Sequence, residues 1–136
     1  SPFTGATPPD FDSQYSRLVE YSVDEEARTV DQTWSFHGPG KGSLFSYAVG
    51  DADYLPRTGH VLGTYGFLTV VNGEEHETRG VGTASVRVIE VDPKTQDVVF
   101  DVTLDAPLSI LPGGWHGYRA ERIDMFGQKR AAVSPD

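Results

Sequence analysis

The stretch that decides the fold runs from Phe45 to Gly66 and reads FSYAVGDADYLPRTGHVLGTYG. Its first half, Ser46 to Leu55, alternates roughly between small or apolar and polar residues, which is the period of a β-strand. Pro56 cannot donate to a strand ladder, and Thr58-Gly59 supplies turn geometry. His60–Tyr65 then resumes as an apolar-rich segment. The pattern predicts a β-hairpin that is entered through small residues and turns at Pro-Arg-Thr-Gly.

Two further hairpins are predicted, one on each side of this stretch. Tyr15–Val23 alternates as a strand and is joined through an acidic turn to a second alternating run, Thr29–Phe36. Downstream, Ala84–Val91 and Asp97–Leu104 flank a turn that contains Asp92-Pro93. Fifteen glycines and nine prolines in 136 residues favour short strands joined by turns over long helices.

The two ends of the chain differ from this pattern. Ser1–Ser13 (SPFTGATPPDFDS) is typical of a loop or a cut linker. Tyr118–Phe126 (YRAERIDMF) predicts one last strand, and Gly127–Asp136 is expected to be a fraying tail. The chain begins at Ser1 and not at Met, which is expected of a processed or trimmed product.

The first and last hairpins are similar to each other, which indicates an internal repeat. RLVEY at 17–21, followed by Val30–Trp34, parallels RVIEV at 87–91, followed by Val98–Val102. The hairpin of Phe45–Gly66 lies between the copies, so the unit is four antiparallel strands, the layout of a β-propeller blade. The predicted fold class is therefore all-β. It comprises the outer half of a blade over 15–36, a complete blade over 45–104 and a closing strand over 117–126. Propellers have typically 4–8 blades, so a fragment, a subunit of a ring and a different β fold all remain open.

Charge and composition exclude several classes of partner. Twenty acidic against eleven basic residues give a formal net charge of −9, without a Lys/Arg stripe that could bind nucleic acid or an anionic membrane. No run approaches the ~18 apolar residues of a membrane span. The absence of cysteine excludes a disulfide scaffold and a thiolate metal site, but it leaves the compartment open. A small anionic substrate stays compatible with this charge, because its site needs only a few local donors.

Three segments together resemble the C-terminal part of the bacterial arylsulfotransferases. They are YSRLVEYSVDEEARTVDQTW at 15–34, GDADYLPRTGHVL at 50–62 and YRAERI at 118–123, and the similarity extends from Tyr15 to Phe126. The resemblance implies a six-bladed β-propeller in the periplasm that transfers sulfate without a nucleotide donor, and no cofactor is expected. In that family a histidine near the propeller axis takes the sulfuryl group from a phenolic sulfate and passes it to a phenol.

The resemblance places pocket-lining residues in this chain and no catalytic residue. The family's histidines and arginine lie on inner strands upstream of this segment, and the matching position here is Ala48, which cannot be a nucleophile. Tyr118 matches a tyrosine that lines the family's substrate pocket. Ala48-Val49 matches a larger apolar residue and a threonine, so Val49 departs from the pattern by losing a hydroxyl. The implied partners are a phenolic sulfate donor, a phenol acceptor and the remaining N-terminal blades of the same propeller.

Other residues suggest different chemistry. Asp51 and Asp53 share one face of a strand about 6–7 Å apart, which would suit a glycosidase pair, but structural and solvent-facing roles are favoured. The four histidines have no i,i+4 spacing and no carboxylate beside them in a known ligand pattern, so structural roles are favoured and no metal site is expected: His37, His60, His76 and His116. Three alternatives stay open: a non-catalytic β-propeller or β-sandwich that binds a ligand or partner, a hydrolase that uses the two aspartates, and a ring of identical chains.

Overall fold

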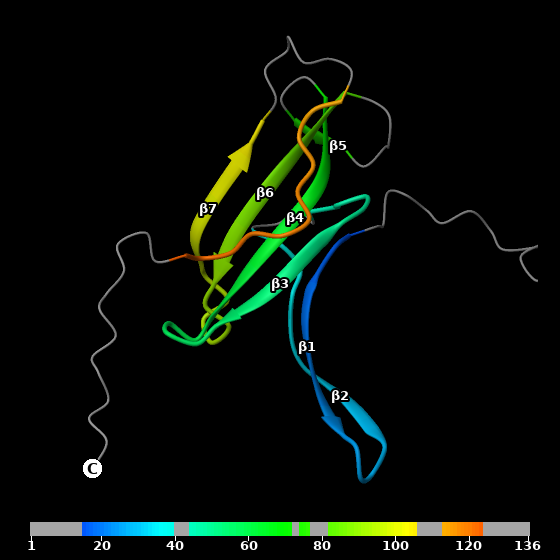
Figure 1. Cartoon of the computed structure of the whole chain (residues 1–136), viewed down its shortest axis with the longest axis vertical. Coiled ribbons are helices and arrows are strands. Elements are labelled where there is room, and N and C mark those ends of the chain that lie inside the picture. The colour runs from blue at the N-terminus through cyan, green and yellow to red at the C-terminus, as the bar shows by residue number, and fades with distance from the viewer. Residues whose placement is uncertain (1–14, 40–43, 72–73, 77–81, 106–112, 124–136) are drawn as a thin grey trace, which may run out of the picture.

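The computed structural model describes residues 15–39, 44–71, 74–76, 82–105 and 113–123, and all seven regular elements there are β-strands (Figure 1). The predicted all-β class is confirmed. A two-stranded antiparallel sheet contains β1 (Leu18–Asp24) and β2 (Thr29–Phe36). A second sheet has the strand order β3 (Gly50–Leu55), β4 (His60–Val71), β6 (Thr83–Val91) and β7 (Val98–Leu104), and the short β5 (Glu74–His76) pairs with the end of β4. The described residues contain no helix that could cross a membrane.

All three predicted hairpins are formed, and their turns explain why. In the β1–β2 turn the Ala27 N–H donates to Asp24 Oδ1 over 2.8 Å, which lets an aspartate side chain hold the turn. In the β3–β4 turn the Gly59 N–H donates to the Leu55 carbonyl over 2.8 Å. Gly59 has a φ of +76° there, in the left-handed region that glycine enters without penalty.

The strand registers contain the internal repeat that the sequence predicts. In the first hairpin Glu20 pairs with Trp34, and the register shifts between Glu20 and Tyr21. In the last hairpin Glu90 pairs with Phe100, and the register shifts at the equivalent place, directly after Glu90. A bulge at the same position bends and twists both hairpins alike.

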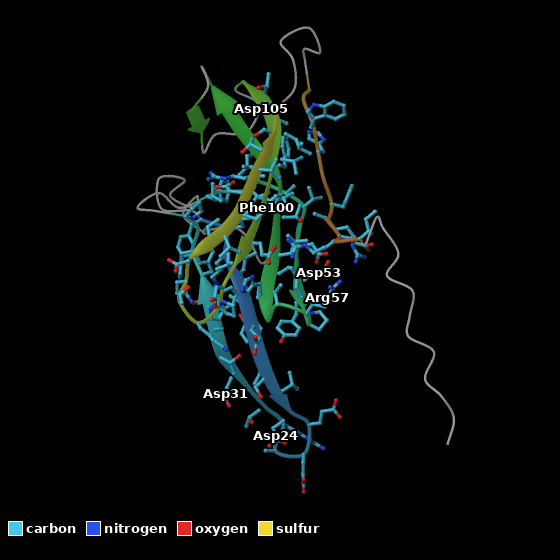
Figure 2. The ribbon with its side chains drawn as sticks, turned by 90° about the vertical axis from the view of Figure 1, so that its left-hand side faces the viewer. Asp24, Asp31, Asp53, Arg57, Phe100 and Asp105 are labelled. Carbon is cyan, nitrogen blue, oxygen red and sulfur yellow. The ribbon has the colours of Figure 1, made fainter. Side chains whose placement is uncertain are left out.

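The four-stranded sheet is apolar on both faces. On one face the start of β1 and the end of β2 pack against the two central strands, β4 and β6 (Figure 1). Leu18 packs directly on Gly63: a Cβ added there would lie 2.5 Å from Leu18 Cδ1, so the leucine side chain would have to shift. The buried residues of this cluster are Leu18, Phe36, Leu44, Val61, Tyr65, Leu68, Ile89 and Val91. The far end of the β1–β2 hairpin, with Asp24 and Asp31, projects away from this core (Figure 2).

The opposite face is covered by the segment 113–123, which crosses the sheet as an extended chain (Figure 1). Leu62, Val86 and Val88 are buried there, with Ala120 packed against them. The strand expected over Tyr118–Phe126 is not formed as far as Ile123, and residues 124–126 lie outside the described residues. Gly114 forms one isolated parallel bridge with Ala84 of β6, and the physical reason that no strand follows is that the chain then crosses the face of the sheet. Its hydrogen bonds are scattered, such as the one from the Ala120 N–H to Thr64 Oγ1 over 3.0 Å.

Two predicted regions cannot be compared with the structure. The linker Ser1–Ser13 and the tail Gly127–Asp136 both lie outside the described residues.

Candidate substrate pocket

A pocket of about 310 Å³ lies between the start of β1 and the beginning of β3. It contains Ala48 and Val49, two of the three residues that the family resemblance assigns to pocket lining. Arg17 and Asp51 are the charged residues among those that line it. The lining residues are Ser16, Arg17, Leu18, Val19, Ser46, Ala48, Val49, Gly50, Asp51, Ala52, Thr64 and Tyr65.

Ser46 lines this pocket and fixes the backbone beside it through hydrogen bonds. Its Oγ accepts the Phe67 N–H over 3.0 Å, and its hydroxyl hydrogen has two carbonyl acceptors at 3.0 Å, those of Ala48 and Val49. These bonds curl the chain, so regular strand β3 begins at Gly50 and not at Ser46 as expected. The chain between Ser46 and Gly50 forms a turn that exposes Ala48 to the pocket.

Val49 has a strained backbone in this turn. Its φ is +55°, in the left-handed region that a β-branched residue rarely adopts and that costs roughly 1–3 kcal/mol. The Val49 carbonyl accepts the Gly66 N–H over 3.3 Å in addition to the Ser46 hydroxyl. Strain of this kind persists only where neighbouring contacts hold it, and it is often found at functional sites.

Gly66 connects Val49 to the C-terminal segment. It lies where the β4–β6 register shifts between Tyr65 and Leu68, and its carbonyl accepts the Gly117 N–H over 3.0 Å. A Cβ at this position would be 1.8 Å from the Gly117 oxygen and 2.9 Å from Val49 Cγ2. The bulge at Gly66 therefore brings the Val49 turn and the neighbour of Tyr118 together.

Tyr118 itself points to solvent. Its exposed fraction is 76%, and it is not among the residues that line the pocket beside Val49. The structure thus places Ala48 and Val49 in one pocket and brings Tyr118 near it through Gly117, while the tyrosine ring lies outside.

Asp51 and Asp53 belong to an ion-pair network around Arg119. Arg119 Nε lies 3.6 Å from Asp51 Oδ2, and Arg119 Nη2 lies 3.7 Å from Asp53 Oδ2. The same Nη2 is 2.7 Å from Glu121 Oε1. Both aspartates thus lie near one arginine, whereas a glycosidase pair has to face a substrate. This geometry supports the structural role over a hydrolase.

Three of the predicted histidines have packing or ion-pair partners. The His37 ring lies 5.1 Å from the Tyr15 ring, and the His116 ring lies 4.4 Å from the Phe67 ring, both between centroids. His60 Nδ1 lies 2.7 Å from Glu90 Oε1. His76 is in β5, and its side chain lies outside the described residues. No group of three or more His, Asp or Glu in the described part of the chain is placed to hold a metal ion.

Glu90 is the residue that sequence reasoning missed. Its side chain is 3% exposed, and Arg122 Nη2 lies 2.6 Å from its Oε2 as an ion-pair contact. The sequence signal was the run VIEV, because a strand that is apolar on both faces buries any carboxylate within it. A buried carboxylate requires polar or charged partners; Arg122 supplies a guanidinium group and His60 a ring nitrogen.

The pocket can hold a small polar group, and four of its lining residues carry a hydroxyl: Ser16, Ser46, Thr64 and Tyr65. The hydroxyls of Ser16, Ser46 and Thr64 each have a hydrogen-bond partner within the chain. No histidine is among the lining residues. Arg17 is the lining group that could bind an anionic oxygen.

Comparison with known proteins identifies the family. The family model described as Arylsulfotransferase (ASST) matches residues 4–119, which is most of the chain. Comparisons with curated proteins and with solved structures gave no match. The match agrees with the resemblance of the three sequence segments, and the chain belongs to the arylsulfotransferase (ASST) family.

Proposed function

We propose that this chain is the C-terminal segment of a nucleotide-independent sulfotransferase, which moves a sulfuryl group from a phenolic sulfate ester to a phenol. The family match supports a sulfotransferase-like function in general. The observation that carries the finer proposal is the pocket at the start of β3, which is lined by Ala48 and Val49 and has Arg17 at its wall. In the proposal this segment shapes the pocket, and a histidine outside the 136 residues forms the sulfohistidine intermediate.

The proposed chemistry has two balanced steps. An imidazole nitrogen attacks sulfur while the S–O bond to the donor breaks, and a general acid protonates the leaving phenoxide. The acceptor phenol oxygen then attacks sulfur, the N–S bond breaks, and the phenol proton is taken up by a base. Negative charge on the equatorial oxygens needs cationic or N–H donors in both steps. Arg17 is the residue of this chain proposed for that role.

The same proposal includes a β-propeller built with N-terminal blades that supply further strands. The order β3-β4-β6-β7 has the form of one antiparallel blade. The outer strand β7 exposes an apolar stripe on the face that also carries Leu62, Val86 and Val88, which is what a neighbouring blade would cover. The stripe consists of Phe100, Val102 and Leu104, with exposed fractions of 46%, 37% and 52%.

A difference between the two copies of the repeat supports the proposal that blades stack on each other. Glu90 is buried between His60 and Arg122, whereas its counterpart Glu20 is exposed and accepts a hydrogen bond from Thr33 Oγ1 over 3.0 Å. The difference follows from what surrounds each copy, since Glu90 has β4 and the C-terminal segment beside it. In a complete propeller Glu20 would acquire equivalent neighbours from an upstream blade.

We place the parent protein in the periplasm by its family resemblance, acting on phenolic donors and acceptors without a cofactor. The net charge of −9 supports the further proposal that nucleic acid and anionic membranes are not partners. Fractionation of cells that express the protein tests the location, and recovery in the cytoplasmic fraction would contradict it.

The central experiment offers the purified protein 4-nitrophenyl sulfate and a phenol acceptor, with release of nitrophenolate as the readout. Protein denatured at alkaline pH, where the N–S bond is not activated by protonation of the imidazole, is expected to carry one SO₃ group on a histidine outside residues 1–136. The isolated 136-residue chain is expected to show no turnover. Turnover by that chain, or a sulfuryl group on His37, His60, His76 or His116, would overturn the assignment of the nucleophile.

Arg17 gives the same experiment a residue-level test. Arg17→Gln is expected to raise KM about tenfold, the effect of losing one charge-assisted hydrogen bond. Arg28→Gln is the matched control, because it removes the same charge from the exposed β1–β2 turn. Equal KM values for the two variants would remove Arg17 from the site.

A second candidate is a non-catalytic β-propeller or β-sandwich that binds a ligand or a partner. It is favoured by the inert side chains of Ala48 and Val49, which line the pocket without a reactive group. Binding of an aryl sulfate without nitrophenolate release and without a labelled histidine would decide for this candidate.

A further inference from the structure

A second pocket, of about 230 Å³, lies at the turn between β3 and β4. It is lined by Leu55, Pro56, Arg57, Thr58 and Arg122, and none of these residues lines the pocket beside Ala48. The two pockets lie at opposite ends of β3, about 17 Å apart for a strand of this length. We propose that this turn pocket binds a small aromatic monoanion, a single ring that carries one carboxylate or sulfonate group.

The charge of the lining points to an anionic ligand. Two of the five lining residues carry guanidinium groups, and no acidic side chain is among them. This is unusual in a chain whose formal net charge is −9. Guanidinium groups bind planar carboxylate and sulfonate groups through paired N–H donors.

Arg122 is held in place by the buried carboxylate of Glu90. Its Nη2 lies 2.6 Å from Glu90 Oε2, and its Nη1 donates to Glu90 Oε1 over 3.4 Å. His60 Nδ1 lies 2.7 Å from that same Oε1. A guanidinium group has five N–H donors, so these contacts leave donors for a ligand in the pocket. A cation fixed in advance binds an anion with a smaller loss of side-chain entropy.

The remaining lining indicates an apolar body on the ligand. Leu55 packs against the buried cluster of Leu62, Val86 and Val88, and Pro56 adds a rigid apolar wall. Arg57 lies in the turn that follows β3 (Figure 2) and lines the same pocket. The volume is below the ~300–1,000 Å³ of sites for drug-sized ligands, which suits one ring with one headgroup.

The test titrates the purified protein with benzoate and follows the backbone amide signals of the β3–β4 turn by NMR. Benzoate is expected to bind with a Kd of about 1 mM and to shift the Thr58 and Gly59 amides while leaving those of Ala48 and Val49 unchanged. Benzamide removes the charge and acetate removes the ring, so both are expected to bind about tenfold more weakly. A parallel titration with benzenesulfonate determines which of the two headgroups is preferred.

Variants separate the pocket from general anion attraction. Arg57→Gln is expected to weaken benzoate binding about tenfold, whereas Lys94→Gln, which removes a cation from the exposed β6–β7 turn, should leave it unchanged. Arg57→Gln should leave the rate of sulfuryl transfer unchanged. A negative result for this pocket would therefore leave the proposed function standing, and the reverse also holds. Equal affinity for acetate and benzoate, or no loss in Arg57→Gln, would overturn the aromatic-anion site.

Discussion

Gly66→Ala tests whether the C-terminal segment holds the substrate pocket in shape. The added Cβ would lie 1.8 Å from the Gly117 oxygen and 2.9 Å from Val49 Cγ2. An ordinary C···O contact is about 3.3 Å, so one of the two backbones must move by about 1.5 Å. The neighbouring atom at 1.8 Å is a backbone carbonyl and cannot rotate away as a side chain would.

The expected cost follows from what this movement breaks. Overpacking of a close contact costs roughly 1–3 kcal/mol, and losing the bond from the Gly117 N–H to the Gly66 carbonyl adds about 1 kcal/mol. We therefore expect Gly66→Ala to lower the free energy of unfolding by about 2–4 kcal/mol. Val49 would lose its close neighbour at the same time, so KM for the aryl sulfate should rise as well.

Gly59→Ala is the matched control, because it isolates the backbone contribution. Gly59 has a φ of +76°, but the nearest atom to its added Cβ is Tyr54 Oη at 3.9 Å. Its cost is left-handed strain alone, about 1–2 kcal/mol. Urea unfolding of both variants measures the difference, with the slope of the transition as a check on the two-state assumption. A Gly66→Ala variant within about 0.5 kcal/mol of the original protein, a change typical of surface substitutions, would refute this reasoning.

Three further substitutions test the packing, the buried carboxylate and the acidic pair. Leu18→Ala should lower the free energy of unfolding by about 2–4 kcal/mol in urea, since Leu18 joins the first hairpin to the sheet; a loss below about 1 kcal/mol would argue against that docking. Glu90→Gln should lower the free energy of unfolding, measured by thermal unfolding, by about 1–3 kcal/mol. Arg122→Gln should lower it further, because it leaves the carboxylate buried with His60 alone. A larger loss in Glu90→Gln than in Arg122→Gln would contradict the ion pair. Asp51→Asn should leave kcat for sulfuryl transfer within about twofold, because exposed ion pairs contribute little, whereas loss of turnover would revive the hydrolase alternative.

The strands and turns were predictable from the sequence because their signals are local. The alternation of Thr29–Phe36 matches the full extent of β2, and the Thr58-Gly59 turn is formed where glycine is required. The repeat was also visible in the sequence, as RLVEY and RVIEV. In the structure a bulge follows the glutamate in both copies. Each of these features depends on residues within one hairpin.

The features that the sequence did not predict depend on contacts between distant segments. The alternation along Tyr118–Phe126 is compatible with a strand, but the segment crosses a sheet face that its own pattern does not specify. The ion pairs of Arg119 with Asp51 and Asp53 depend on that crossing, as does the pairing of Arg122 with the buried Glu90. Local alternation indicates which side of a strand is apolar, but it does not indicate which segment covers it.

The pocket beside Val49 is therefore a product of tertiary contacts more than of the β3–β4 hairpin alone. Ala48 and Val49 are positioned by a turn whose φ of +55° at Val49 is unfavourable by itself. The Ser46 hydroxyl donates to the Val49 carbonyl, and Gly66 lies between Val49 and Gly117 and is close to both. If residues 113–123 were detached, the support on the far side would be lost and Val49 could relax toward an extended backbone. The segment that covers the sheet face thus also supports the chain that lines the pocket, and a Cβ at Gly66 would lie 1.8 Å from the Gly117 oxygen at their crossing.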